Sequence, residues 1–396
     1  MARKNTTRTA AGSGSIRQRP DGTWEARYTI GRDPGTGKQR RKSVYGKTQK
    51  EVRQKLAQAV AALDSGTYFE PSNMLLSRWV EIWLAEYMGD KKYGTVKHYI
   101  AQCKTHIVPS LGAVKLSALT PPQIQSFYNS LQRDGLAAKS VRNVHGILTK
   151  CLSIAVSVGY LRDNPCQRVT LPKVQKAEIV PLTDEQVKAF LKEAAGDSME
   201  ILFNVILFTG LRESEALGLT WDCVDFNAGT IKINKQLQKR PRKDGGFVFD
   251  TPKNGKGRVI RTAPYVMDLL QRCKREQAAQ RLRAGQAWQG WQTAAEAKTA
   301  LVFTTEAGLN FTQPSVVRHY KKIVTAIGIP QSRVHDLRHT FAVLSLQNGD
   351  DIKTVQTNLG HATAAFTLDV YGHASERMKE ESAARMQGYI ESVSNL

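Results

Sequence analysis

The chain has 396 residues, of which 41% are hydrophobic and 23% charged, a globular composition that excludes wholesale disorder and leaves room for several domains. Its charge is unusual, because 57 Lys and Arg against 35 Asp and Glu leave a net charge of +22. A compact protein tolerates such a surplus best when an anionic polymer or surface neutralises it, so nucleic acid or an anionic membrane is the expected partner.

Neither a membrane span nor export is expected from the sequence. No apolar run approaches the roughly 18 residues of a spanning helix, and the basic N-terminus lacks the apolar stretch of a signal peptide. The five cysteines are scattered without paired spacing, which is typical of a reducing compartment. We therefore expect a cytoplasmic protein with no membrane partner.

Residues 1–66 are predicted to form a small βββα domain that begins with a flexible arm at residues 1–13. The turn signature Pro20-Asp21-Gly22 and a second Gly-rich turn separate three short β-type runs, and an amphipathic helix follows them. Residues 1–60 hold 15 Lys and Arg and four Asp and Glu, so half of the net charge lies in the smallest unit. This concentration predicts a DNA-reading sheet that uses Arg17, Arg19, Trp24, Arg27, Tyr28 and Arg40. The alternative is a solvated domain whose aromatic residues are merely its core.

Residues 72–165 are predicted to be helical throughout and to form a four-helix domain. Apolar residues recur at helical spacing, and Pro109 to Gly112 are expected to break the second segment. Basic residues on these helices could contact DNA or could simply be solvated, and the candidates are Lys97, Lys139 and Arg142. A proline-punctuated linker follows at residues 166–181.

Residues 182–396 are predicted to form a third, mainly helical domain with a small antiparallel sheet. Strand patterns lie at 230–234, 247–249 and 258–262, helices surround them, and an amphipathic tail helix is predicted over 375–393. Residues 284–300 form an insertion without a readable role. The fold class is therefore a multidomain α+β protein.

Separated polar clusters in the third domain make chemical sense together. In Thr209–Glu215, Arg212 follows an apolar helix, and Glu215 can orient its guanidinium. His335 and Arg338 are spaced i and i+3, which places them on one helical face. The remaining members are Lys253 in the Gly-broken turn Thr251–Gly257, the Leu359–His361 segment, and Tyr371.

In order and spacing, these clusters resemble the tyrosine recombinase family, most closely the integrases of conjugative transposons and temperate phages. The resemblance covers the whole chain and implies an arm-binding N-terminal domain, a helical core-binding domain and a C-terminal catalytic domain. Carried over residue by residue, it implies the catalytic set Arg212, Lys253, His335, Arg338, His361 and Tyr371. Glu215 and His339 are expected to be supporting residues.

The residue types suit the transfer of a DNA phosphodiester to a protein hydroxyl. Negative charge develops on the non-bridging oxygens of a five-coordinate phosphorus. The permanently charged guanidinium groups of Arg212 and Arg338 can stabilise this charge. His335 can accept the proton of Tyr371, because histidine titrates near neutrality. Lys253 is the candidate donor to the leaving 5′-oxygen. The phosphotyrosyl bond keeps the energy of the original linkage, so no cofactor or metal is expected.

Each of these residues also has a structural interpretation. Tyr371 could be a core aromatic residue, and the arginines could form structural ion pairs. Lys256 lies in the same turn as Lys253 and could replace it. The spacing of His335 and His339, with His361 as a third ligand, could indicate zinc, although Arg338 would repel the cation.

Three functions remain as hypotheses: a site-specific recombinase, a type IB-like topoisomerase and a silent DNA-binding protein. The basic N-terminal domain and the helical domain favour the recombinase, because a topoisomerase that only relaxes DNA has no need to read two DNA sites. The resemblance implies double-stranded DNA with crossover and distal arm sites, a homotetramer, an accessory excision factor, a DNA-bending protein and a place at the bacterial nucleoid. The tail helix would pack on a neighbouring subunit or on its own domain.

Overall fold

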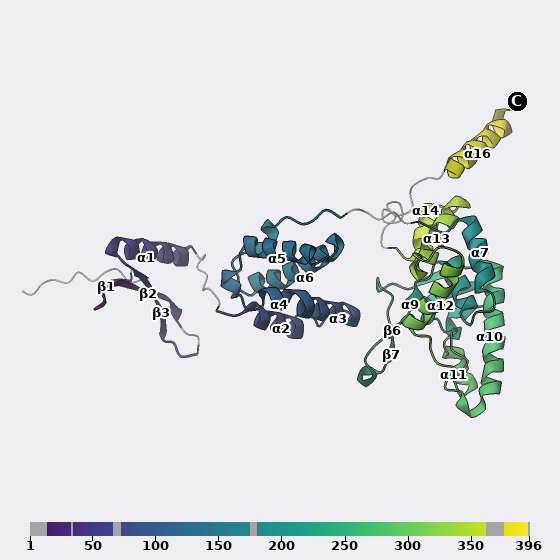
Figure 1. Ribbon diagram of the computed structural model, residues 1–396, viewed down its shortest axis with the longest axis horizontal. Coiled ribbons are helices and arrows are strands. Elements are labelled where there is room, and N and C mark those ends of the chain that lie inside the picture. The colour runs from purple at the N-terminus through teal and green to yellow at the C-terminus, as the bar shows by residue number, and fades with distance from the viewer. Residues whose placement is uncertain (1–13, 33–34, 66–72, 175–179, 362–375, 395–396) are drawn as a thin grey trace, which may run out of the picture. The chain divides into compact units, whose positions relative to one another are not determined.

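The computed structural model describes residues 14–32, 35–65, 73–174, 180–361 and 376–394 (Figure 1). The chain divides into two compact units, Met1–Lys176 and Ala177–Leu396. The boundary between them falls inside the linker predicted at residues 166–181. Among the helices within these described ranges, none is long and apolar enough to cross a membrane.

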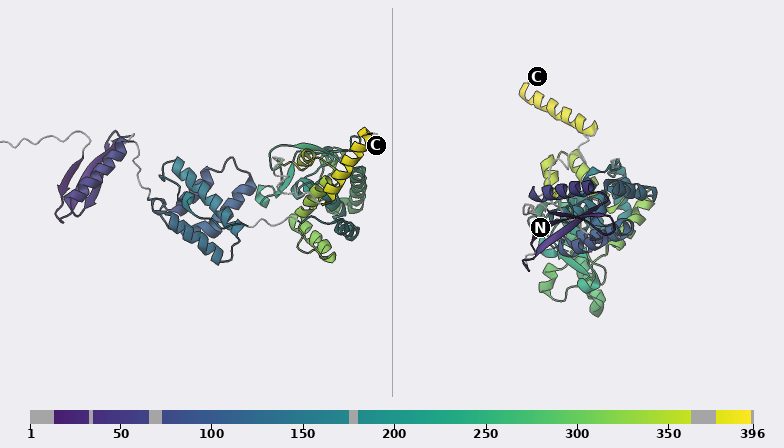
Figure 2. Two further views of the ribbon diagram at one scale, coloured as in Figure 1. Left: turned by 90° about the horizontal axis from the view of Figure 1, so that it is seen from above. Right: turned by 90° about the vertical axis from the view of Figure 1, so that its left-hand side faces the viewer.

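The first unit begins with a three-stranded antiparallel sheet of order β1-β2-β3, formed by Ser15–Gln18, Trp24–Arg32 and Gln39–Gly46. Helix α1 (Gln49–Asp64) starts where the Thr48 side chain accepts a hydrogen bond from the Glu51 amide, and it lies along one face of the sheet (Figures 1 and 2). Its core consists of Ala26, Tyr28, Val52 and Leu56. The predicted βββα order is confirmed.

The rest of this unit is helical, as predicted. Its helices are α2 (Leu76–Glu86), α3 (Tyr93–Gln102), α4 (Val108–Leu111), α5 (Pro121–Arg133) and α6 (Ala138–Ser157). Pro109 does not break the second segment, because a π-helical turn at Cys103–Ile107 joins α3 to α4. Pro109 lies inside this continuous helical segment, directly after the π-helical turn, and the segment ends at Leu111 with Gly112 as its C-cap, so the predicted break falls at Gly112.

The first half of the predicted linker packs on the helical module. Cys166 is buried, and Val169 and Leu171 contact the same core. The Gln125 amide exchanges two hydrogen bonds with the Thr170 backbone, at 2.8 and 3.1 Å, and Arg142 Nε donates to the Pro172 carbonyl at 2.8 Å. The linker is therefore shorter than its proline pattern indicates.

The second unit is mainly helical and contains two small antiparallel sheets. The helices are α7 (Asp184–Ala194), α8 (Glu200–Thr209), α9 (Glu213–Leu217), α10 (Pro264–Ala284), α11 (Ala294–Thr299), α12 (Gln313–Ala326), α13 (Val334–Gln347), α14 (Ile352–Leu359) and the tail helix α16 (Glu376–Ser394). One sheet has the order β4-β5-β8, formed by Val224–Asp225, Thr230–Ile233 and Arg258–Arg261, and β6 (Gln236–Lys239) pairs with β7 (Phe247–Asp250). The three predicted strands are confirmed, whereas sequence analysis missed β4, which has only two residues, and β6, which is as long as the predicted strands.

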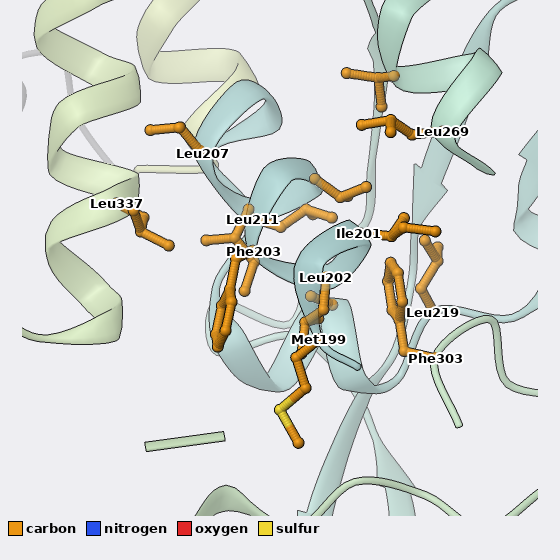
Figure 3. Close-up of a cluster of buried hydrophobic side chains, with 14 of the residues drawn as sticks. Met199, Ile201, Leu202, Phe203, Leu207, Leu211, Leu219, Leu269, Phe303 and Leu337 are labelled. Atoms are coloured by element: carbon orange, nitrogen blue, oxygen red, sulfur yellow. The ribbon is translucent and has the colours of Figure 1, made fainter. Parts of the chain in front are cut away.

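Helix α8 lies at the centre of this unit. It is hydrophobic on all sides, and nearly all of its residues are buried. Figure 3 shows its side chains, including Phe203 and Leu207, packed near Leu269 of α10 and Leu337 of α13. The core thus fixes the end of α8, from which the Thr209–Glu215 segment departs.

The insertion at residues 284–300 packs against the C-terminal end of α10. Trp288 is buried, and its indole N–H donates to the Trp291 carbonyl at 2.9 Å. The Arg281 guanidinium lies 4.1 Å from the centre of the Trp291 ring. These contacts give the insertion a packing role in its own domain.

Candidate active site

Arg212 is positioned by the turn between α8 and α9. Helix α8 ends at Gly210, whose positive φ of 65° suits glycine and where a Cβ atom would lie 2.4 Å from Phe341. Arg212 is the N-cap residue of α9, and its amide and Nη1 donate to the two Glu215 carboxylate oxygens at 3.1 and 2.8 Å. Glu215 therefore orients Arg212, as the sequence predicted.

Glu215 also holds a second arginine, which sequence analysis missed. Arg258, at the start of β8, donates from Nη2 and Nη1 to the Glu215 carboxylate at 2.7 and 3.1 Å. Burial alone would raise the pKa of Glu215, but the hydrogen bonds and charge of Arg258 and the charge of Arg212 hold it at about 2. The carboxylate is thus ionised between two guanidinium groups.

Arg338 joins the Thr209–Glu215 segment to the Leu359–His361 segment. It is almost wholly buried in α13, and it donates from Nη1 to the Gly210 carbonyl and from Nη2 to the Leu359 carbonyl at 2.5 and 2.6 Å. The end of α14 accepts further hydrogen bonds, since Arg258 Nε donates to the Asn358 carbonyl at 2.7 Å. Arg212 Nη2 donates to the Gly360 carbonyl at 3.4 Å. Three arginines therefore converge on three consecutive carbonyls at a helix C-terminus, where the helix dipole favours cations.

The predicted histidines lie beside these arginines. The His335 and His339 rings are 4.7 Å apart and nearly perpendicular. Partial burial, followed by the charges of His339, Arg338 and Arg212, lowers the pKa of His335 to about 4, although part of the residue is open to solvent. Burial and the charges of Arg338 and Arg212 lower the pKa of His361 to about 3, and burial also lowers that of His339. All three imidazoles are therefore neutral at pH 7.

The same arginine charges argue against the zinc hypothesis, because they would repel a cation. Within the part of the chain that the structure describes, no group of three or more His, Cys, Asp or Glu residues is placed to hold a metal ion. The site instead presents fixed positive charge and neutral hydrogen-bonding rings, a combination that suits an anion.

The lysine turn reaches the same cluster through its neighbour. Lys253 is exposed in the turn between β7 and β8. The Asn254 side-chain amide donates to the Gly360 carbonyl at 3.0 Å, so this carbonyl accepts from both Asn254 and Arg212. The structure therefore brings together four of the five predicted segments, whereas Tyr371 lies outside the described residues and stays a prediction.

A cavity of about 260 Å³ opens beside Arg212 and His335. The β6–β7 hairpin and Phe311 form its other walls, together with Glu213. Burial raises the pKa of Glu213, which accepts a hydrogen bond from the Gln313 side chain, and its Oε1 has no partner among the described residues. Sequence analysis missed Glu213, although its position directly after Arg212 could have indicated that it lies at the site.

The proposed DNA-binding residues of the sheet separate onto two faces. Arg17 and Arg27 form ion pairs with Glu25 on the face away from α1, at 2.6 and 2.9 Å. Tyr28 is buried and Trp24 packs against the same core, so these two aromatic side chains do not lie among the arginines. This corrects the predicted arrangement: the aromatic residues belong to the core, and the exposed arginines of the opposite face stay the candidates for DNA contact. The sequence of β2 already indicated this division. Apolar and charged residues alternate from Trp24 to Tyr28, and neighbouring residues of a strand point to opposite faces of the sheet.

The remaining basic candidates are at the surface. Arg19 lies over the Tyr45 ring at 5.5 Å, and the exposed residues also include Arg40, Lys97 and Lys139. Arg142 is exposed as well, but its Nε donates to the Pro172 carbonyl. Arg142 thus has a structural role whether or not it meets DNA.

Comparison with known proteins agrees with this geometry. Residues 179–378 match the phage integrase family, and residues 75–132 match the N-terminal SAM-like domain of phage integrases. The chain belongs to the phage integrase family, and it is a tyrosine recombinase, an enzyme for site-specific DNA recombination. Family membership selects the recombinase from the three hypotheses.

Relatives and solved structures extend the match over most of the chain. A tyrosine recombinase XerC-like protein of Caldanaerobacter subterraneus subsp. tengcongensis is 29% identical over 89% of this chain and 92% of its own length. The ICEBs1 integrase of Bacillus subtilis is 24% identical over 95% of this chain and 100% of its own. The Tn1549 transposon integrase in complex with transposon right end DNA is 21% identical, has a TM-score of 0.67, and covers 79% of this chain and 100% of that one. A lambda integrase dimer bound to a COC′ core site has a TM-score of 0.58 at 18% identity, over 95% and 99% of the chains, so the fold is shared.

Proposed function

We propose that this integrase cleaves and rejoins DNA through a 3′-phosphotyrosyl intermediate and so integrates and excises a mobile element. The supporting observation is the convergence of Arg212, Arg338 and the lysine turn on the carbonyls of Leu359 and Gly360, with His335 and His361 beside them. Tyr371 follows His361 by ten residues. Because ten residues span at most about 35 Å, the chain can bring Tyr371 back to this cluster.

The chemistry follows from the charges of the cluster. The Tyr371 oxygen bonds to phosphorus as the bond to the 5′-oxygen breaks, and Arg212 and Arg338 offset the charge on the non-bridging oxygens. His335 is neutral at pH 7 and can accept the tyrosine proton, while the Lys253 ammonium gives a proton to the leaving 5′-oxygen. His361 can hydrogen-bond the phosphate. A 5′-hydroxyl from another strand reverses the step, so the reaction needs no external energy.

Two substitutions test this assignment. Tyr371→Phe should leave DNA binding intact and abolish the covalent adduct, because only the attacking oxygen is removed. Arg212→Lys should reduce cleavage by about 100-fold or more, because an ammonium cannot reproduce the two-pronged contact that a guanidinium makes. The measurement is trapping of the adduct on a suicide substrate. Persistent cleavage by Tyr371→Phe would refute the nucleophile assignment.

A homotetramer on paired DNA sites is the proposed working assembly. A lambda integrase tetramer bound to a Holliday junction has the same fold, with a TM-score of 0.57 at 19% identity over 88% of this chain and 96% of that one. In this chain, α16 exposes the apolar side chains of Met386, Tyr389, Ile390 and Val393. Docking of α16 on a neighbouring subunit would cover this stripe and link cleavage to assembly.

The N-terminal sheet is the proposed reader of distal arm sites, with the helical module at the crossover site. Support comes from the charge concentration in residues 1–60 and from the exposed Arg17 and Arg27. We also propose an accessory excision factor and a DNA-bending protein as partners, and the bacterial nucleoid as the place of action.

A further inference from the structure

We propose that Asn254 is a positioning residue that fixes the Lys253 ammonium for proton transfer to the leaving 5′-oxygen. This inference rests on the proposed function, in which Lys253 is the proton donor. It adds a residue that neither the sequence motifs nor the family resemblance assigns to the reaction.

The first step of the argument is the geometry of the turn. The Gly255 amide donates to the Pro252 carbonyl at 2.9 Å, so Lys253 and Asn254 are the two central residues of a hydrogen-bonded turn. Gly255 has a φ of +69°, which glycine adopts without strain. Because the two central residues share one peptide plane, fixing Asn254 limits the orientations that are open to Lys253.

The second step is that the two ends of the turn are held separately from its tip. On the entry side, the buried Gln236 donates to the Thr251 carbonyl at 2.9 Å and accepts from Ser214 at 3.0 Å. On the exit side, Arg258 is bound to Glu215 and to the Asn358 carbonyl. The tip itself carries the hydrogen bond from Asn254 to the Gly360 carbonyl.

The third step is the position of that carbonyl. Gly360 caps α14 in the left-handed conformation, and a Cβ there would approach Arg258 Nη1 to 3.0 Å. Its carbonyl oxygen, with two lone pairs, also accepts from Arg212 and directly precedes His361. Asn254 therefore ties the lysine turn to the atom at which the phosphate-binding arginine and the histidine segment meet.

The test separates proton donation from general structural damage. In a DNA substrate whose leaving 5′-oxygen is replaced by sulfur, the leaving group departs as a thiolate and needs no proton, because thiols are much stronger acids than alcohols. Single-turnover cleavage by the full chain is measured on the oxygen and sulfur substrates for Lys253→Ala, Asn254→Ala and Asn254→Asp. Asn254→Asp keeps the size of the side chain but removes the donor. Lys256→Ala, in the same exposed turn, is the matched control.

We expect Asn254→Ala and Asn254→Asp to cleave the oxygen substrate about tenfold more slowly, the effect of losing one orienting hydrogen bond, and the sulfur substrate at the wild-type rate. Lys253→Ala should lose more on oxygen and recover on sulfur, and Lys256→Ala should match the wild type on both. Wild-type cleavage of the oxygen substrate by both Asn254 variants, or equal slowing on both substrates, overturns the inference. If instead Lys253→Ala is not impaired, or is not rescued by sulfur, the assignment of Lys253 itself fails and the inference fails with it.

Discussion

Two regions of this molecule use the same arrangement, a carboxylate between two arginines, in different surroundings. Glu215 lies between Arg212 and Arg258, whose side chains are 19% and 8% exposed. Glu25 lies between Arg17 and Arg27, whose side chains are 59% and 49% exposed. Hydrogen bonds from Arg27, Ser43 and Arg17 hold the pKa of Glu25 at about 2, the same value as for Glu215.

The difference lies in what else the arginines contact. Arg212 and Arg258 also donate to carbonyls at the end of α14, so their positions are fixed before DNA arrives. Fixed positive charge aimed at one phosphate is the requirement for stabilising a transition state. Arg17 and Arg27 are largely solvated, which suits contacts that must adapt to a DNA backbone. In the proposed function, the same chemical group would serve the reaction in one region and DNA binding in the other.

The largest expected effect is the loss of the buried carboxylate. Glu215→Gln should lower the free energy of unfolding of the second unit by about 3–5 kcal/mol, because Arg258 becomes a buried charge without its partner. Cleavage should fall with it, since Arg212 loses its orientation. Glu25→Gln is the matched control and should change stability much less, because solvent screens its arginines. Denaturant unfolding measures both variants, and equal destabilisation by the two would contradict the comparison.

Removal of residues 1–66 should affect DNA binding rather than the cleavage chemistry. A chain without residues 1–66 should still cleave a short crossover-site duplex but bind arm-site DNA weakly. The salt dependence of overall binding should flatten, because about half of the net charge is removed. Affinity measured across a salt series tests this expectation. Unchanged arm-site binding by the shortened chain would place the second DNA-reading surface elsewhere.

The smallest expected effect is a pH dependence that the second unit shows and the sheet domain of residues 1–66 does not. His335 and His361 have pKa values of about 4 and 3 when folded, below the usual 6.5, so below pH 6.5 the folded state binds fewer protons than the unfolded state. Stability of the second unit should therefore decrease as the pH falls from about 6.5 toward 5, a range above the usual pKa of carboxyl groups. Residues 1–66 contain no histidine and should not respond in this range. Hydrogen exchange in α13 and β2 compares the two regions, and equal responses would contradict the assignment.

The sequence predicted the site well where the chemistry lies in consecutive residues. The pairing of Arg212 with Glu215 follows from i, i+3 spacing at a helix start, and His335 with Arg338 from spacing on one helix. Sequence analysis failed where a partner is distant in the chain. Arg258 is 43 residues from Glu215, and no local pattern distinguishes it from the other basic residues of its strand.

By itself the sequence determined the order of elements, the basic N-terminal unit and the residue types available for phosphoryl transfer. These depend on local periodicity, capping and composition, which are properties of neighbouring residues. Only the tertiary structure decided that three arginines meet three consecutive carbonyls at the end of α14, and that Asn254 reaches the same point. Backbone carbonyls carry no sequence signature, because every residue has one, so only the folded chain selects which of them accept these hydrogen bonds.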